Sequence, residues 1–230
     1  MLGWLQVASE MRIYAHAGVA AKHPPNTMSA FREALVTDCY GIELDIHCSS
    51  DGVPVTTHDE TLERLTNGRG LVADHTVAQL AALDAGNGEG ISTLEEVFAL
   101  VGDKRHFDLE IKAKHCERAV LDLLRRYPQV RAAISSFDWE VLANVRALAP
   151  DIELWVLTST VSDEAIAAGK FLNATMLAVY YQPLTTTSIA QAKNAGLEVM
   201  AWTANTKKEA DRLRKIGVAA LCTDDPDGVR

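Results

Sequence analysis

Eight short apolar segments alternate with amphipathic stretches along nearly the whole chain, and this alternation constrains the fold more than any other feature. The apolar segments begin near residues 12, 41, 107, 131, 152, 175, 198 and 219. Most stretches between them have helical spacing, as in 116–127 and 207–217. Such alternation is typical of parallel strands joined by helical crossovers. With eight strands and no GxGxxG loop after the first, the pattern favours an α/β fold of the (β/α)8 TIM-barrel type over an open doubly wound sheet.

One further apolar run, 54–58, does not fit this alternation. Only about six residues separate it from the strand before it, whereas a parallel crossover needs about a dozen. We interpret 49–52 as a turn and 54–58 as the returning arm of a short hairpin. Asn26 is expected to cap a helix that runs from about 27 to 37. Because no Ser/Gly-rich or Pro-rich linker divides the 230 residues, we expect a single domain over 1–230.

Charge and cysteine content narrow the choice of partners and compartment. The formal net charge of -9 makes nucleic acid a poor partner, although a metal ion can still hold a small phosphorylated substrate. Cys39, Cys48, Cys116 and Cys222 are widely spaced, and we expect them to be reduced rather than to bind zinc. Residues 1–12 lack a signal-peptide pattern, and no apolar run reaches the roughly 20 residues of a membrane span. A cytoplasmic protein without stable membrane insertion is expected, and its oligomeric state stays open.

Acidic residues stand at the ends of two neighbouring predicted strands. Glu43 and Asp45 are two residues apart, so both project from the same face of their strand. Glu110 and Lys112 repeat this spacing on the next strand of the barrel. Any one of these acids, taken alone, is more often a solvated residue at a strand end or a member of a structural ion pair than a metal ligand. Together, carboxylates at successive strand ends favour one divalent cation, Mg²⁺ or Ca²⁺, which would offset their repulsion.

Two histidines occupy matching positions near these acids. His16 ends the first strand, and His58 ends the hairpin arm beside Asp59. An imidazole titrates near neutral pH, so a histidine pair suits general acid and base catalysis. His47 shares the strand face of Glu43 and is expected either to line the pocket or to support residues that do. The other four histidines are expected at the surface, and they are His23, His75, His106 and His115.

Several segments together resemble the glycerophosphodiester phosphodiesterase family. They cover nearly the whole chain from Arg12 and include IYAHAG, PPNTMSAF, GIELDIHCSSDGVPVTTHDETLERLTNGRG, LEIK, AWTAN and GVAALCTDDPD. The resemblance implies a TIM barrel that hydrolyses a glycerophosphodiester, a small molecule, to an alcohol and glycerol 3-phosphate. It also implies that Asn26 and Asn67 fix loops rather than touch substrate.

The resemblance assigns roles to individual positions. The family's metal ligands fall on Glu43, Asp45 and Glu110. Its catalytic pair falls on His16 and His58. The phosphate-contacting lysine falls on Lys112, and a pocket-lining aromatic residue falls on Trp202.

Two positions depart from the family pattern, and both lie after the first strand. Ala17 replaces the arginine of an HRG motif, and Pro25 replaces the glutamate of a PENT motif. A guanidinium that would bind substrate phosphate is therefore missing, and one hypothesis is that Lys22 replaces its charge. Three alternatives follow: an active enzyme, an enzyme for another diester such as a lysophospholipase D-like enzyme, and a non-catalytic barrel that binds phosphorylated metabolites.

Overall fold

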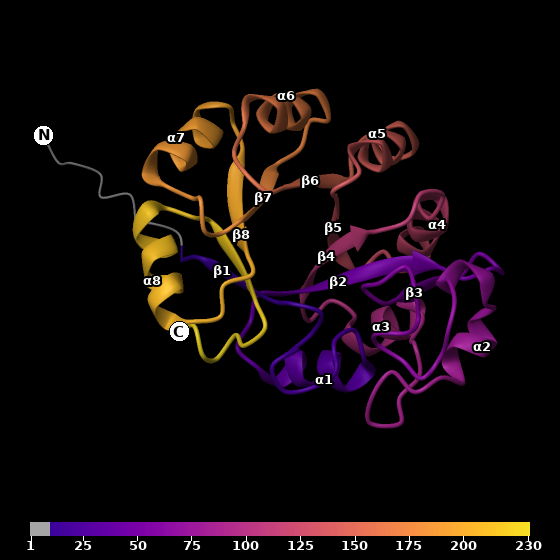
Figure 1. The fold of residues 1–230 in the computed structure, drawn as a ribbon. Helices are drawn as coiled ribbons and strands as arrows, with labels where there is room; N and C mark the ends of the chain where they lie inside the picture. The colour runs from indigo at the N-terminus through magenta and orange to yellow at the C-terminus, as the bar shows by residue number, and fades with distance from the viewer. Residues whose placement is uncertain (1–9) are drawn as a thin grey trace, which may run out of the picture.

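The computed structural model describes residues 10–230, and its centre is a closed barrel of eight parallel strands (Figure 1). Around the barrel the strands follow the order β1-β9-β8-β7-β6-β5-β4-β2, and β1 also pairs with β2. Their bounds are Arg12–Ala15 (β1), Gly41–Cys48 (β2), His106–Ile111 (β4), Arg131–Ser136 (β5), Glu153–Thr158 (β6), Met176–Tyr180 (β7), Glu198–Trp202 (β8) and Ala220–Thr223 (β9). The predicted TIM barrel is confirmed, and each strand begins within one residue of its predicted start. The signal-peptide prediction concerns mostly residues 1–9, which lie outside the described range.

The predicted hairpin is also present. Strand β3, Pro54–Thr56, pairs antiparallel with the end of β2, and Cys48 lies opposite Pro54. Immediately after β3, the Thr57 N–H donates to the Asp45 carbonyl at 3.1 Å. The hairpin therefore brings the chain back to the acidic end of β2 just before His58.

Helices surround the barrel as a ring in Figure 1. They are α1 (Met28–Val36), α3 (Leu94–Val101), α4 (Glu117–Arg126), α5 (Trp139–Leu148), α6 (Asp163–Phe171), α7 (Thr186–Asn194) and α8 (Lys207–Ile216), with the short η1 (Val72–Asp74) and α2 (Val77–Ala81) after the hairpin. Within residues 10–230, no helix is long and apolar enough to cross a membrane.

The prediction that Asn26 caps the first helix is wrong. Thr27 is the N-cap, and its hydroxyl oxygen accepts the Ala30 N–H at 3.4 Å. Asn26 instead has a left-handed backbone, with φ of 60°, and its side chain contacts β2. Asparagine tolerates this backbone region better than most residues, so the position serves the loop rather than the helix.

Strand residues alternate between the barrel interior and the layer of helices. Ile42, Leu44 and Ile46 of β2 pack in the large core between strands and helices, whereas Glu43 and Asp45 lie between them in sequence and line the interior. A second apolar cluster fills the barrel itself, and it consists of Tyr14, Ala133, Trp155, Leu157, Met176, Ala178, Met200, Ala220 and Cys222. The interior therefore changes from apolar to acidic along the barrel axis.

Aromatic side chains close the N-terminal end of the barrel. Tyr14 packs edge-on against Trp155, and His106 stacks on the same indole with ring centroids 5.8 Å apart. A side chain at Gly41 would collide with the Tyr14 ring, which explains the glycine there. The prediction that His106 lies at the surface is wrong, because this first residue of β4 is only 8% exposed.

Candidate active site

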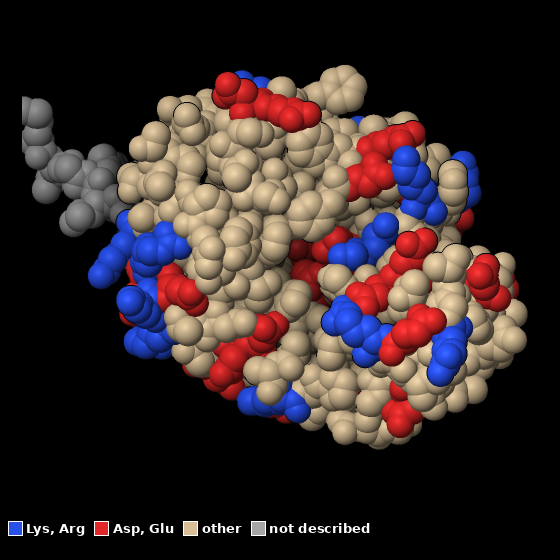
Figure 2. Space-filling view, in the orientation of Figure 1, with Lys and Arg blue, Asp and Glu red and all other residues tan. Residues whose placement is uncertain are grey.

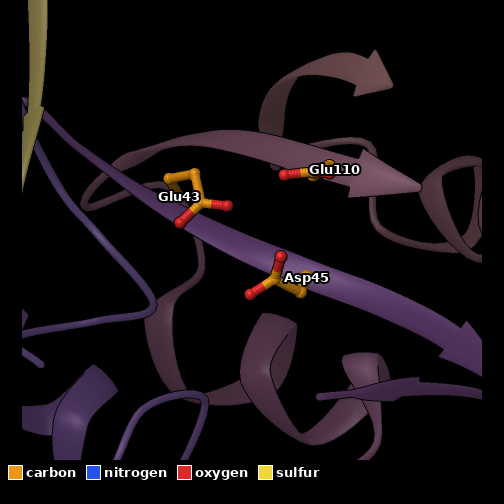
Figure 3. A group of neighbouring side chains, drawn as sticks. All are labelled: Glu43, Asp45 and Glu110. Carbon is orange, nitrogen blue, oxygen red and sulfur yellow. The ribbon is translucent and has the colours of Figure 1, made fainter. Parts of the chain in front are cut away.

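Three carboxylates meet at the C-terminal end of the barrel (Figure 3). Glu43 and Asp45 project from β2, and Glu110 projects from β4, where it lies level with Asp45. One oxygen of each lies within 4.8 Å of the others, and all three residues are buried. Adjacent parallel strands in register thus bring together the acids that the sequence spacing predicted on one face.

Charge in this cluster is only partly balanced. Burial and the nearby charge of Asp45 raise the pKa of both Glu43 and Glu110. Lys112 provides some compensation, with its Nζ 2.9 Å from Glu110 Oε1 and 3.3 Å from Asp45 Oδ1. Carboxylate oxygens are the ligands that Mg²⁺ and Ca²⁺ prefer, so this donor set fits either ion.

The loop after β1 holds two of these acids in place. The Ala17 N–H donates to Glu43 Oε2 at 2.9 Å. The Asn26 side-chain amide donates to Asp45 Oδ2 at 2.8 Å, and its oxygen accepts the Asp45 N–H at 3.2 Å. The expectation that Asn26 fixes the first loop is therefore confirmed. Asn67 similarly accepts the Asp84 N–H at 2.9 Å and joins two loop segments away from the pocket.

His16 lies on one side of the acidic cluster. Its Nδ1 donates to Asp224 Oδ1 at 2.6 Å, and its Nε2 lies 3.9 Å from Glu43 Oε2. Asn205 holds Asp224 in turn, donating to Oδ2 at 2.5 Å and accepting the Asp224 N–H at 2.9 Å. Burial opposes a charge on His16, but the hydrogen bond to Asp224 and the charge of Glu43 outweigh it and raise the His16 pKa to about 9.

His58 lies on another side and has a comparable partner. Its Nδ1 donates to Asp59 Oδ1 at 2.7 Å, and its Nε2 lies 3.4 Å from Lys112 Nζ. Arg64 contacts both oxygens of Asp59, and these hydrogen bonds are the main reason that the Asp59 pKa falls to about 2. His47 does not line the pocket. Its Nε2 lies 3.3 Å from the His58 carbonyl, which gives it the supporting position that the sequence left open.

The carboxylates and both histidines line one pocket, and Figure 2 shows acidic atoms recessed in this hollow. Its other side is apolar and includes Phe137, Leu157, Ala178 and Trp202. The rings of Phe137 and Trp202 meet edge to face at 5.5 Å. The buried indole N–H of Trp202 has no hydrogen-bond partner among residues 10–230. Trp202 therefore contributes its ring to the apolar side of the pocket.

Lys22 does not enter this pocket. Its Nζ lies 2.8 Å from Glu33 and 3.4 Å from Asp227, on the outer surface of the first loop. The hypothesis that Lys22 replaces the missing arginine is therefore contradicted. Among the described residues that line the pocket, Lys112 is the only lysine or arginine.

Sequence reasoning missed Asp108 and Asp224. Asp108 lines the pocket one step deeper than Glu110, accepts the Ser135 hydroxyl at 2.6 Å, and has a pKa raised to about 8 by burial. Its signal was the same two-residue spacing that identified Glu43 and Asp45. Asp224 directly follows the last strand, so its strand-end position was the available signal.

The family of the chain follows from sequence comparison. Residues 16–228 match the model of the glycerophosphoryl diester phosphodiesterase family. The chain belongs to this family. A family relative, the glycerophosphodiester phosphodiesterase of Caldanaerobacter subterraneus, is 34% identical over 229 residues, which cover 94% of each chain. Another, from Bacillus altitudinis, is 33% identical and covers 94% of this chain and 95% of its own length.

Solved structures of family members share the fold. A phosphodiesterase of Oleispira antarctica, solved with the product sn-glycerol-3-phosphate, matches with a TM-score of 0.90 at 27% identity, covering 95% of this chain and 94% of that one. The glycerophosphodiester phosphodiesterase of Thermotoga maritima matches with a TM-score of 0.81 at 27% identity, covering 94% and 96%. The resemblance stated from the sequence is thus confirmed, and the chain is a phosphodiesterase of this class.

Proposed function

We propose that the protein hydrolyses a glycerophosphodiester to an alcohol and glycerol 3-phosphate, with one divalent cation and a histidine pair. The observation that carries this proposal is one pocket that contains the three-carboxylate cluster and both His16 and His58. The product complex of the Oleispira antarctica relative supports glycerol 3-phosphate as the product.

Glu43, Asp45 and Glu110 would hold the cation, and Mg²⁺ and Ca²⁺ both suit their oxygens. When bound, the cation would polarise a phosphate oxygen and offset the charge that develops during the reaction. The raised pKa values of Glu43 and Glu110 support this role, because buried acids without enough positive charge around them resist ionisation.

The two histidines would transfer the protons. Each directs Nδ1 toward an aspartate, Asp224 for His16 and Asp59 for His58, which fixes the ring and leaves Nε2 for the substrate. One imidazole removes a proton from the nucleophile and the other protonates the leaving alkoxide. The nucleophile is water or the neighbouring hydroxyl of the glycerol group, and both routes need the same two transfers.

Lys112 would provide the protein's own contact with the phosphate. Ala17 has no side-chain donor, and its backbone N–H is already bound to Glu43. Trp202 and Phe137 would cover the less polar part of the substrate. The active site therefore holds phosphate with the cation and one lysine in place of the family's arginine.

Replacement of each histidine by alanine tests the proposal. His16→Ala and His58→Ala should each lower kcat about 100-fold to 10,000-fold with glycerophosphocholine as substrate. The matched control is His115→Asn, at an exposed residue with a left-handed backbone that asparagine tolerates. Circular dichroism should show all three variants folded, and EDTA should abolish wild-type turnover. Full turnover without metal, or with either histidine absent, contradicts the mechanism.

A substrate panel separates the remaining alternatives. Hydrolysis of glycerophosphocholine but not of lysophospholipid micelles supports a small-molecule diesterase, and the reverse supports a lysophospholipase D-like enzyme. A non-catalytic barrel would show a thermal shift with Ca²⁺ and glycerol 3-phosphate but release no product from any diester.

A further inference from the structure

Arg64 lies beside His58 and binds the aspartate that contacts this ring. Its Nε donates to Asp59 Oδ2 and its Nη2 donates to Asp59 Oδ1, so the guanidinium contacts both carboxylate oxygens. The Arg64 side chain is 63% exposed, and it does not line the reaction pocket. An exposed ion pair adds little stability as a rule, but a two-point contact between guanidinium and carboxylate fixes their relative orientation. Arg64 is therefore placed to orient Asp59 rather than to touch the substrate.

The chain segment around Arg64 is itself held in place. Thr61 forms an isolated β-bridge with Leu71, and the Leu62 N–H donates to the Gly70 carbonyl at 3.0 Å. Leu62 is only 1% exposed and packs in a small apolar cluster beside the barrel. A closed loop with a buried anchor two residues before Arg64 therefore sets the direction from which the guanidinium reaches the carboxylate.

The contacts of His58 indicate which ring nitrogen carries the proton. Its Nδ1 lies 2.7 Å from Asp59 Oδ1, and an ionised carboxylate can only accept a hydrogen bond, so Nδ1 is the donor. Arg64 Nη2 lies farther from Nδ1, at 3.4 Å. The Nε2 of His58 lies 3.4 Å from the Lys112 ammonium group, which can only donate. In the neutral ring, Nε2 therefore has the lone pair and faces the acidic pocket.

The other histidine of the pocket has the same arrangement, built from a different part of the chain. His16 Nδ1 lies 2.6 Å from Asp224 Oδ1, and the Asn205 amide donates to Asp224 Oδ2 at 2.5 Å. In both cases the third side chain binds Oδ2 of the aspartate while Oδ1 accepts from the ring. Arg64 thus has the position relative to His58 that Asn205 has relative to His16.

We propose that Arg64 is a positioning residue for the phosphodiesterase reaction. By binding both oxygens of Asp59, it holds the His58 ring in one orientation, with the proton on Nδ1 and with Nε2 directed into the pocket. This role rests on the proposed function of His58 in proton transfer. The alternative is direct contact between Arg64 and the substrate phosphate, in place of the arginine that is absent at Ala17. The position of Arg64 outside the pocket lining favours the first role.

Kinetics of Arg64 variants separate the two roles. Arg64→Ala should lower kcat for glycerophosphocholine about 10-fold to 100-fold and leave KM within about twofold, because the ring position affects the transition state more than substrate binding. Arg64→Lys should recover only part of this loss, since an ammonium group cannot bind both carboxylate oxygens in one plane. A raised KM with unchanged kcat, or full recovery with lysine, would overturn the inference.

The matched control for these variants is Arg69→Ala. Arg69 is an exposed arginine of the same segment, and it lies outside the pocket lining. Its replacement should change kcat and KM less than about twofold. An equal loss of kcat in Arg69→Ala and Arg64→Ala would mean that the charge of the segment matters rather than the contact with Asp59, which also overturns the inference.

A double-mutant cycle tests whether Arg64 acts through Asp59. Asp59→Ala alone should lower kcat at least as much as Arg64→Ala does. In the Asp59→Ala background, Arg64→Ala should then change kcat less than about twofold, since the partner of the guanidinium is already absent. Equal losses from Arg64→Ala in both backgrounds would show that Arg64 acts without Asp59.

A measurement without turnover distinguishes failure of this inference from failure of the proposed function. Nitrogen NMR spectroscopy of the full chain at about pH 8, where an ordinary imidazole is neutral, reports the tautomer of His58. The His58 signals are assigned by their loss in His58→Ala. Wild type should show the Nδ1–H tautomer, and Arg64→Ala should show a mixture of both tautomers.

The two failures then differ. A single, unchanged tautomer in Arg64→Ala would overturn the inference, whether or not the protein is active. Full activity of His58→Ala would instead contradict the proposed function, and a tautomer mixture in Arg64→Ala would still support the effect of Arg64 on the ring.

Discussion

His16 and His106 lie at opposite ends of the barrel. The fold shifts their pKa values in opposite directions from the ordinary value of a histidine. At the end that holds the acidic pocket, Asp224 and Glu43 raise the His16 pKa to about 9 despite burial. At the closed end, burial dominates and lowers the His106 pKa to about 4, against the weaker opposing effect of Glu153. His106 has Tyr14 Oη 3.1 Å from its Nδ1 and a Glu153 oxygen 4.0 Å from its Nε2. The same residue type therefore has a raised pKa at one end of the barrel and a lowered pKa at the other.

The residues around the two histidines differ as well. The pocket end concentrates like charges that a folded protein tolerates only with compensation, whereas the closed end packs aromatic rings against one another. Function should therefore depend on the first region and stability on the second. Four substitutions test this division.

Glu43→Gln should have the largest effect on function. If Glu43 holds the proposed cation, this change should lower kcat/KM at least about 100-fold. The same change should raise the Tm of the metal-free protein at neutral pH, because the raised pKa of Glu43 means that its ionisation opposes folding. Hydrolysis assays and thermal unfolding in EDTA measure the two effects. A lower Tm in EDTA would show that this acid stabilises the fold.

Trp155→Ala should have the largest effect on stability. The indole is fully buried between Tyr14 and His106, and its removal should cost about 3–5 kcal/mol of unfolding free energy. Denaturant titration measures this loss. At a temperature where the variant is folded, kcat should stay within about threefold of wild type. A hundredfold loss of kcat in the folded variant would break the division between the two ends.

His106→Gln should change the pH dependence of stability. The unfolded chain binds a proton at this histidine near pH 6.5, but the folded protein does so only near pH 4. The contribution of His106 to the free energy of unfolding is therefore fully present above about pH 6.5 and is lost as the pH falls toward 4. The groups that face this ring are Tyr14, Trp155 and Glu153, with Arg12 and Arg131 nearby.

The measurement is the unfolding free energy of both proteins at several pH values. Wild type should lose on the order of 2–3 kcal/mol more than the variant between pH 6.5 and 4. Taking the difference cancels the titration of the acids at the other end of the barrel. Parallel pH profiles would mean that His106 titrates normally.

Lys22→Ala should have the smallest effect. Its ammonium group pairs with Glu33 and Asp227 outside the pocket, so KM and kcat should each change less than about twofold. Lys112→Ala is the matched comparison, because Lys112 lines the pocket and its loss should raise KM. A large KM increase for Lys22→Ala would restore a role in phosphate binding.

Local patterns in the sequence predicted much of this molecule. The eight strands, the hairpin and the inward alternation of Glu43, Asp45 and Glu110 all appear where the spacing placed them. Helix capping was less predictable, because Asn26 and Thr27 both have capping side chains. Only the position of β2 decided that Asn26 would bind Asp45 and leave the cap to Thr27.

Sequence periodicity by itself determined which residues share a strand face, since that depends only on the covalent geometry of the chain. Tertiary structure alone decided which distant residues meet. Closure of the barrel places β9 beside β1 and so brings Asp224 to His16, and the register of β2 with β4 brings Glu110 level with Asp45. The burial of a side chain, which shifts its pKa, also depends on these non-local contacts. The raised pKa of His16 and the lowered pKa of His106 were therefore set by their neighbours in space, because solvation and Coulomb energies depend on distance through the fold.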